Sequence, residues 1–298
     1  MSRQLKSVYD RSVNFVLACS QEHAPSYLEA RYVRRVPEKI SAYVSSHNGC
    51  KMGCKMCYLT QLGQTSFNHS THHDYEKQFD QVLSYYDKNG EERAKKVNCN
   101  FMARGEPLAN KTVVNEYDQL FETLDRRASL SNLKLKVNIS TIMPHTIIDH
   151  ELVNIFGKNS QTEIYYSLYS IKPEFRKQWL PNAINYNAGL AKLKDYQLAT
   201  GNQITLHWAY IKGHNDSVSD VEELASTISK YQLFGKVNLV RYNPPPNLEH
   251  TEEPDEEHLL RLLNIVNSGL MNSNTNSSKI IPRVGQDVYA SCGMFIHD

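Results

Sequence analysis

Gly49-Cys50-Lys51-Met52-Gly53-Cys54-Lys55-Met56-Cys57-Tyr58 contains three of the six cysteines of the chain. The spacing C-x3-C-x2-C lets three thiolates reach different irons on one face of a 4Fe-4S cluster, because the loops between them are short. A structural zinc ion is the alternative, and His47, His69, His72 and His73 are near enough in the sequence to supply its fourth ligand. Measuring iron and sulfide would distinguish the two kinds of site.

The composition sets limits on the class of protein. A length of 298 residues suits one large α/β domain with a proper core. The 33 Lys and Arg residues nearly balance the 32 Asp and Glu residues, so the net charge of +1 neither requires nor excludes a nucleic-acid partner. The N-terminus lacks an apolar signal core, and no stretch is long enough to cross a bilayer. We therefore expect a cytoplasmic protein without membrane contact, in a reducing compartment that suits the clustered cysteines.

The segment before the cysteine motif is expected to form local structure only. Apolar residues at roughly helical spacing predict a short amphipathic helix over Leu5–Ala18. The β-branched and aromatic residues of 29–46 predict two strands or a hairpin that leads into the motif. Four cations of this region either contact phosphates or belong to a solvated strand edge, and they are Arg31, Arg34, Arg35 and Lys39.

Helices and strands alternate after the motif. Strands are predicted over 96–102, 133–140, 163–168, 203–211, 236–242 and 279–283. Helices are predicted over 75–86, 112–128, 146–156, 186–196, 217–231 and 254–266, with Ser217 as the N-cap of its helix. The Ser- and Asn-rich segment 269–278 is predicted to be a loop.

This alternation predicts a parallel sheet, in which right-handed crossovers curl about six strands into a partial (β/α)6 barrel of the TIM type. Active sites of such folds lie at the carboxyl ends of the strands. Four groups of residues follow predicted strands in this way: Gly105-Glu106-Pro107, Ser140-Thr141, Ser167-Leu168-Tyr169 and Asn243-Pro244. Each of these groups, taken alone, is more often a helix cap or a turn than a ligand-binding group. The presence of four such groups at strand ends nevertheless predicts a binding site.

With these residues identified, the chain resembles the radical S-adenosylmethionine (SAM) adenine-C2 RNA methyltransferases, the RlmN/Cfr family, from about Glu29 to Phe295. The cysteine spacing is the signature of the radical SAM superfamily. Phe101 to Asn110 resembles the Gly-Met-Gly-Glu-Pro-Leu segment of the family, and Val237 to Pro244 is similar to its Val-Asn-Leu-Ile-Pro-Tyr-Asn-Pro. Gly285 to Gly293 resembles its C-terminal segment Gly-x-Asp-Ile-x-Ala-Ala-Cys-Gly.

The resemblance implies cofactors, partners and roles. It implies a 4Fe-4S cluster on Cys50, Cys54 and Cys57, SAM as second cofactor, an RNA adenosine as substrate, and a reducing partner such as flavodoxin or ferredoxin. Cys292 would carry the methyl group, and Glu29 would correspond to a glutamate that accepts a proton. One domain would span 1–298, with 1–43 and 246–298 as extensions of a core at 44–245. SAM would be bound by Gly105, Glu106, Ser140, Ser167, Leu168, Tyr169 and Asn243.

The implied reaction uses SAM twice. One SAM methylates the Cys292 thiolate by displacement. A second SAM, on the open iron of the cluster, is cleaved to a 5'-deoxyadenosyl radical that takes a hydrogen atom from the S-methyl group. The resulting carbon radical adds to an aromatic carbon that polar methyl transfer does not reach.

The chain departs from the family at one important position. The family has a second cysteine seven residues before the first cluster ligand, which resolves the covalent adduct through a disulfide, but this chain has Tyr43 there. Cys99, Cys19 or an external thiol would have to substitute, although Cys99 is expected to be a core residue. The family also has a separate N-terminal RNA-binding domain, for which the segment before the motif is too short. A radical SAM enzyme of another class, acting on a non-RNA substrate, is therefore the alternative.

Overall fold

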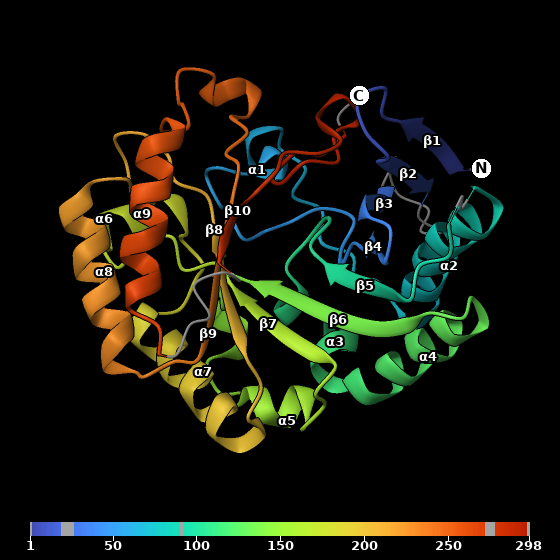
Figure 1. Ribbon diagram of the computed structural model, residues 1–298, viewed down its shortest axis with the longest axis horizontal. Coiled ribbons are helices and arrows are strands. Elements are labelled where there is room, and N and C mark those ends of the chain that lie inside the picture. The colour runs from blue at the N-terminus through green and yellow to red at the C-terminus, as the bar shows by residue number, and fades with distance from the viewer. Residues whose placement is uncertain (1, 19–26, 90–91, 272–277, 297–298) are drawn as a thin grey trace.

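A computed structural model describes residues 2–18, 27–89, 92–271 and 278–296. Its strands form one ten-stranded sheet in which each strand pairs with the next along the chain (Figure 1). No helix in these ranges combines the length and apolarity that a membrane span requires. Cys19 and most of the predicted loop 269–278 lie outside the described residues.

The first four strands are antiparallel and form an extension at one edge of the sheet. They are β1 (Ser2–Lys6), β2 (Val13–Ala18), β3 (Tyr27–Val36) and β4 (Lys39–Tyr43). The prediction of a helix over Leu5–Ala18 is wrong. Val13, Phe15 and Leu17 alternate along β2 and enter the main core, so their period is that of a strand, and β2 pairs with β3 along its whole length. The predicted hairpin that leads into the cysteine motif is confirmed.

The sheet is parallel from β4 to β10, as the alternating pattern predicted. Helices connect the strands and cover the outside of a curved sheet (Figure 1). The partial barrel is thus confirmed. Its elements are α1 (Tyr58–Gln61), α2 (His72–Asn89), β5 (Lys96–Phe101), α3 (Lys111–Asn115), α4 (Tyr117–Leu130), β6 (Lys134–Thr141), α5 (Leu152–Phe156), β7 (Thr162–Tyr166), α6 (Pro173–Trp179), α7 (Tyr186–Thr200), β8 (Ile204–Trp208), α8 (Val218–Lys230), β9 (Gly235–Val240), α9 (Glu256–Ser268) and β10 (Lys279–Ile281).

Some helices differ from their predicted extent. The helix predicted over 112–128 is two helices, because the backbone at Glu116 leaves helical geometry between α3 and α4. The one predicted over 146–156 is a 3-10 turn (His145–Ile147) followed by the short α5. Helix α6 was not predicted. The N-cap prediction is confirmed, since Ser217 accepts a hydrogen bond from the backbone N–H of Asp220 at the start of α8.

The two faces of the parallel strands differ in polarity. Val97 and Cys99 of β5 belong to the core beneath the helices, which confirms the expectation for Cys99. Asn98 and Asn100 alternate with them and line the interior of the barrel. The outer face therefore holds the fold together, while the inner face is left for a site.

Candidate active site

The cysteine motif lies in the loop between β4 and α1. Gly49 permits the close approach of residues 64–66, because a Cβ atom there would lie 2.4 Å from the carbonyl oxygen of Ser66. The backbone N–H of Lys55 donates to the carbonyl of Trp179 at 3.0 Å, which ties the loop to the barrel. All three motif cysteines line a cavity of about 160 Å³ at the carboxyl ends of the strands.

The electrostatics of these thiols suit a cationic group. Burial raises the pKa of Cys50 to about 12, and the neighbouring Cys57 raises it further. Burial also raises the pKa of Cys54, and Cys50 and Cys57 add to the effect. Three partly buried thiolates that line one cavity repel one another unless iron or another metal compensates their charge. The donor set therefore fits an iron-sulfur cluster.

The nearby histidines have other contacts. The ring of His47 stacks on Phe67 with centroids 3.9 Å apart, and burial lowers its pKa to about 3. His69 accepts a hydrogen bond from the backbone N–H of Lys111, and His72 pairs with Glu116 at 2.8 Å. Within the described residues, no three His, Cys, Asp or Glu side chains are placed to hold a single metal ion.

Gly105 and Glu106 form the wall of the cavity that follows β5. Gly105 has φ +91°, and a Cβ atom there would lie 2.5 Å from the hydroxyl of Ser46. The carboxylate of Glu106 accepts the backbone N–H groups of Leu108 at 3.0 Å and Ile142 at 3.1 Å. Burial raises the pKa of Glu106 to about 7. No cation of the described residues pairs with this carboxylate, so it fits a ligand that brings an ammonium group.

Most of the predicted binding residues meet at this cavity. Ser140, Ser167 and Tyr169 line it together with Gly105 and Glu106. Leu168 does not, because its side chain is buried in the main core. Asn243 is not in the cavity wall either. Its amide nitrogen donates to the carbonyl of Cys292 at 2.9 Å, so it positions the segment that carries this cysteine.

Cys292 lies in the same cavity wall, although it comes 235 positions after Cys57 in the sequence. The segment that carries it packs beside α1, where the backbone N–H of Tyr58 donates to the carbonyl of Gly293 at 3.1 Å. Solvent reaches Cys292. Surrounding protein atoms nevertheless raise the pKa of its thiol to about 11, against the opposing effect of Arg31. A second, smaller cavity of about 70 Å³ is lined by Cys292 and Tyr43 together.

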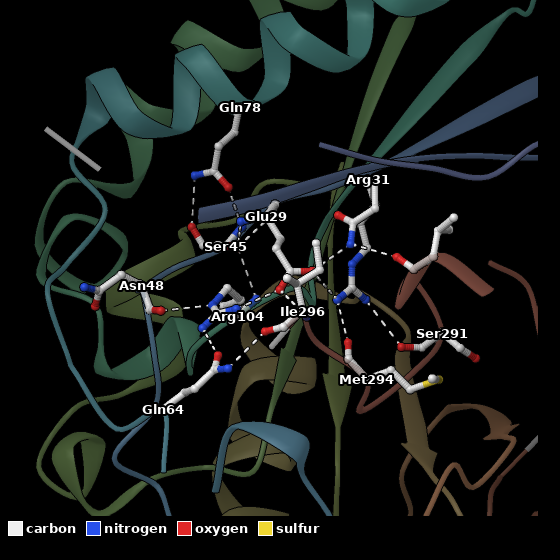
Figure 2. Close-up of polar contacts among 12 residues, drawn as sticks. Glu29, Arg31, Ser45, Asn48, Gln64, Gln78, Arg104, Ser291, Met294 and Ile296 are labelled. Atoms are coloured by element: carbon white, nitrogen blue, oxygen red, sulfur yellow. Dashed lines mark hydrogen bonds and ion pairs between the residues drawn. The ribbon is translucent and has the colours of Figure 1, made fainter. Parts of the chain in front are cut away.

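Glu29 lies outside both cavities, in a buried ion-pair cluster (Figure 2). Its carboxylate accepts four hydrogen bonds, from Arg104 at 2.8 Å, Arg31 at 3.1 Å, Asn14 at 2.8 Å and the backbone N–H of Ile296 at 3.1 Å. Burial alone would raise the pKa of Glu29, but Arg31 and Arg104 hold it below its ordinary value. This position favours a structural role over proton transfer, and the catalytic role stays a prediction.

The same cluster anchors the C-terminal segment, which the sequence analysis did not foresee. Arg31 donates to the carbonyl of Met294 at 2.7 Å and to that of Ser291 at 3.4 Å (Figure 2). Arg104 donates to the carbonyl of Asn48 at 2.9 Å and to Gln64. Arg31 is thus not available for phosphates. The one sequence feature that could have indicated this cluster is Arg104, a cation that directly precedes Gly105 of the predicted site.

Several curated proteins are similar to this chain over most of its length. The chain is 29% identical over 258 residues to the probable dual-specificity RNA methyltransferase RlmN of Aquifex aeolicus, covering 84% of this chain and 67% of that protein. It is 28% identical over 301 residues to the corresponding probable RlmN of Salinibacter ruber, covering 97% of this chain and 75% of that protein. The chain spans about two thirds of the length of the Aquifex relative. No family model matches it.

Solved structures show the same fold. A radical SAM methyltransferase from Sphaerobacter thermophilus superposes with a TM-score of 0.76 at 19% identity, covering 99% of this chain and 80% of that one. Streptococcus suis SuiB, bound to S-adenosylmethionine, gives a TM-score of 0.55 at 15% identity, covering 83% of this chain and 51% of that one. The resemblance recognised in the sequence is thus confirmed: the chain is similar to RlmN proteins over most of its length, and it has the fold of the radical SAM methyltransferase from Sphaerobacter thermophilus.

Proposed function

We propose that the chain is a radical SAM methyltransferase of the RlmN/Cfr type that methylates an adenosine in RNA through Cys292. One observation carries the proposal. The three motif cysteines, the carboxylate of Glu106 and the thiol of Cys292 line one cavity, although they come from three distant parts of the chain.

Cys50, Cys54 and Cys57 would hold the 4Fe-4S cluster, and Gly105, Glu106, Ser140, Ser167 and Tyr169 would hold SAM. When bound, these groups supply one-electron chemistry and an activated methyl group. Glu106 would accept hydrogen bonds from the ammonium group of SAM, which also compensates its buried charge. Gly105 would allow the ligand to approach the backbone closely.

Cys292 would act as the methyl carrier. Once deprotonated, its thiolate would form an S–C bond with the methyl group of SAM, while the bond between that methyl group and the sulfonium would break and S-adenosylhomocysteine would be the leaving group. The ion-pair cluster around Glu29 would hold the segment of Cys292 in place during this transfer. Lys51 on the exposed side of the motif loop suits an acidic reducing partner such as flavodoxin or ferredoxin.

The test uses the anaerobically reconstituted protein with labelled methyl-SAM. The Cys292 peptide should carry label, total RNA should become methylated, and Cys292→Ala should lose both. The buried Cys99→Ala is the matched control and should keep methyl transfer. An unlabelled Cys292 peptide, together with full activity of Cys292→Ala, would refute the proposal.

A radical SAM enzyme of another class is the second candidate, because Tyr43 stands where the family has its resolving cysteine. A phenol does not form the disulfide that resolves an adduct. This candidate predicts 5'-deoxyadenosine without S-adenosylhomocysteine. Formation of both products in equal amounts would exclude it and support the first proposal.

A further inference from the structure

The interior of the barrel holds a third cavity, of about 360 Å³, on the side where the parallel strands begin. This volume is in the range of small-molecule sites. Met102 and His207 line this cavity and both cavities that Cys292 lines, and Tyr43 lines this one and the smaller of those two. The third cavity therefore adjoins the two cavities that Cys292 lines.

Positive charge is concentrated in this cavity. Six cationic side chains line it, and they are Arg35, Lys39, Lys96, Lys136, Lys236 and Lys279. Glu163 pairs with Lys136 and with Lys236, the latter at 2.7 Å. The other four have no carboxylate partner among the described residues. Burial lowers the pKa of Lys39, and the positive charges of Lys279, Lys96, Arg35 and Lys136 lower it further. Such a set of like charges is unfavourable unless an anion binds.

Polar groups of a second kind lie deeper in the same cavity. Asn138 and Asn238 are 2% and 6% exposed, and the side-chain oxygen of each has no hydrogen-bond partner among the described residues. The side-chain oxygen of Asn98 is also unpaired. A buried acceptor without a partner costs free energy that a ligand with N–H or O–H groups would recover. Aromatic rings complete the wall, with Tyr165 and His207 edge to face at 5.4 Å.

These three features select one class of ligand. A phosphate satisfies the cations, a base or ribose supplies donors to the amide oxygens, and a base can stack on an aromatic ring. Inorganic polyphosphate would satisfy the cations alone. We propose that the amino end of the barrel binds the phosphate groups of a nucleotide, whose base and sugar occupy the amide-lined interior on the path to Cys292. This inference rests on the proposed function, because it identifies where the nucleotide substrate of that reaction is held.

Anisotropy of a labelled short oligoribonucleotide, bound to the reconstituted full chain, tests the phosphate site. The variant Lys39→Gln/Lys96→Gln/Lys279→Gln removes three unpaired cations. At about 0.1 M salt it should bind on the order of 10- to 100-fold more weakly, and the slope of log affinity against log salt should fall by about 2. The control Lys77→Gln/Lys88→Gln/Lys230→Gln removes equal charge from exposed helix positions and should bind like the parent. No weakening in the first variant, or equal weakening in both, would overturn the proposal.

Competition identifies the source of the phosphate. Displacement of the probe by AMP indicates that the site binds the phosphate of a free nucleotide. Displacement by unlabelled oligoribonucleotide but not by AMP indicates that the site requires the phosphodiester of an RNA chain. Either result supports the site. Asn238→Leu should weaken binding of the displacing nucleotide but leave competition by inorganic pyrophosphate unchanged. Equal binding of the nucleotide by parent and variant would overturn the nucleotide assignment. Labelling of Cys292 is measured in the same preparation, so loss of that labelling with intact nucleotide binding refutes only the proposed function.

Discussion

The carboxylate of Glu106, which has no cationic partner among the described residues, leads to a quantitative prediction about SAM binding. Its pKa of about 7 means that, at pH 7, the Glu106 carboxyl group is ionised in roughly half of the protein molecules without SAM. If the ammonium group of SAM binds only the ionised form, SAM affinity should fall about tenfold between pH 8 and pH 6, because the ionised fraction falls by that factor. Binding at pH 7 should release about half a proton. Glu106→Gln should weaken binding at pH 8 by about 10- to 150-fold, the equivalent of one hydrogen bond to a charged group.

Calorimetric titration of the reconstituted protein with SAM measures both quantities, since the heat in buffers of different ionisation enthalpy gives the number of protons released. The pH dependence should disappear in Glu106→Gln. Glu122→Gln, an exposed position on α4, should bind SAM like the parent. An affinity independent of pH in the parent, or unchanged affinity in Glu106→Gln, would refute the assignment of this carboxylate to the ammonium group.

Three other predictions concern the surroundings of the site. Glu29→Gln should lower the free energy of unfolding by about 3 to 5 kcal/mol in urea titrations, because it leaves two buried arginines without a carboxylate. It should also speed alkylation of Cys292, whereas Glu116→Gln at the surface should do neither. Burial lowers the pKa of His47 to about 3 in the folded protein, whereas its ordinary pKa of 6.5 applies when the chain is unfolded. The unfolded chain therefore takes up a proton at this residue as the pH falls from 7 to 5. The free energy of unfolding should therefore fall by about 2 kcal/mol between pH 7 and pH 5, and His47→Gln should remove this part of the loss. If the parent and His47→Gln show the same dependence of unfolding free energy on pH, His47 is not the cause. Tyr43→Cys should increase release of methylated product if an adduct accumulates, and turnover no higher than that of Tyr43→Phe would show that resolution occurs elsewhere.

Sequence reasoning recovered the parallel barrel because its strands and helices differ in period and alternate regularly. It failed for β2, where Val13, Phe15 and Val16 fit a helical spacing as well as a strand, and only pairing with β3 decides between them. It identified residues that line the same cavity as the motif cysteines, such as Glu106 and Cys292, because each has a local motif. It could not place Glu29, whose ion pairs depend on side chains from distant segments.

The unequal polarity of the two faces of the parallel strands has a consequence for how this protein could change over time. Apolar side chains on the outer face, such as Val97, supply the burial that keeps the fold stable, whereas Asn98 and its inward-facing equivalents contribute little to it. Substitutions on the inner face should therefore alter which molecule is accepted at small thermodynamic cost. A barrel built in this way can diversify its substrates while its architecture stays fixed.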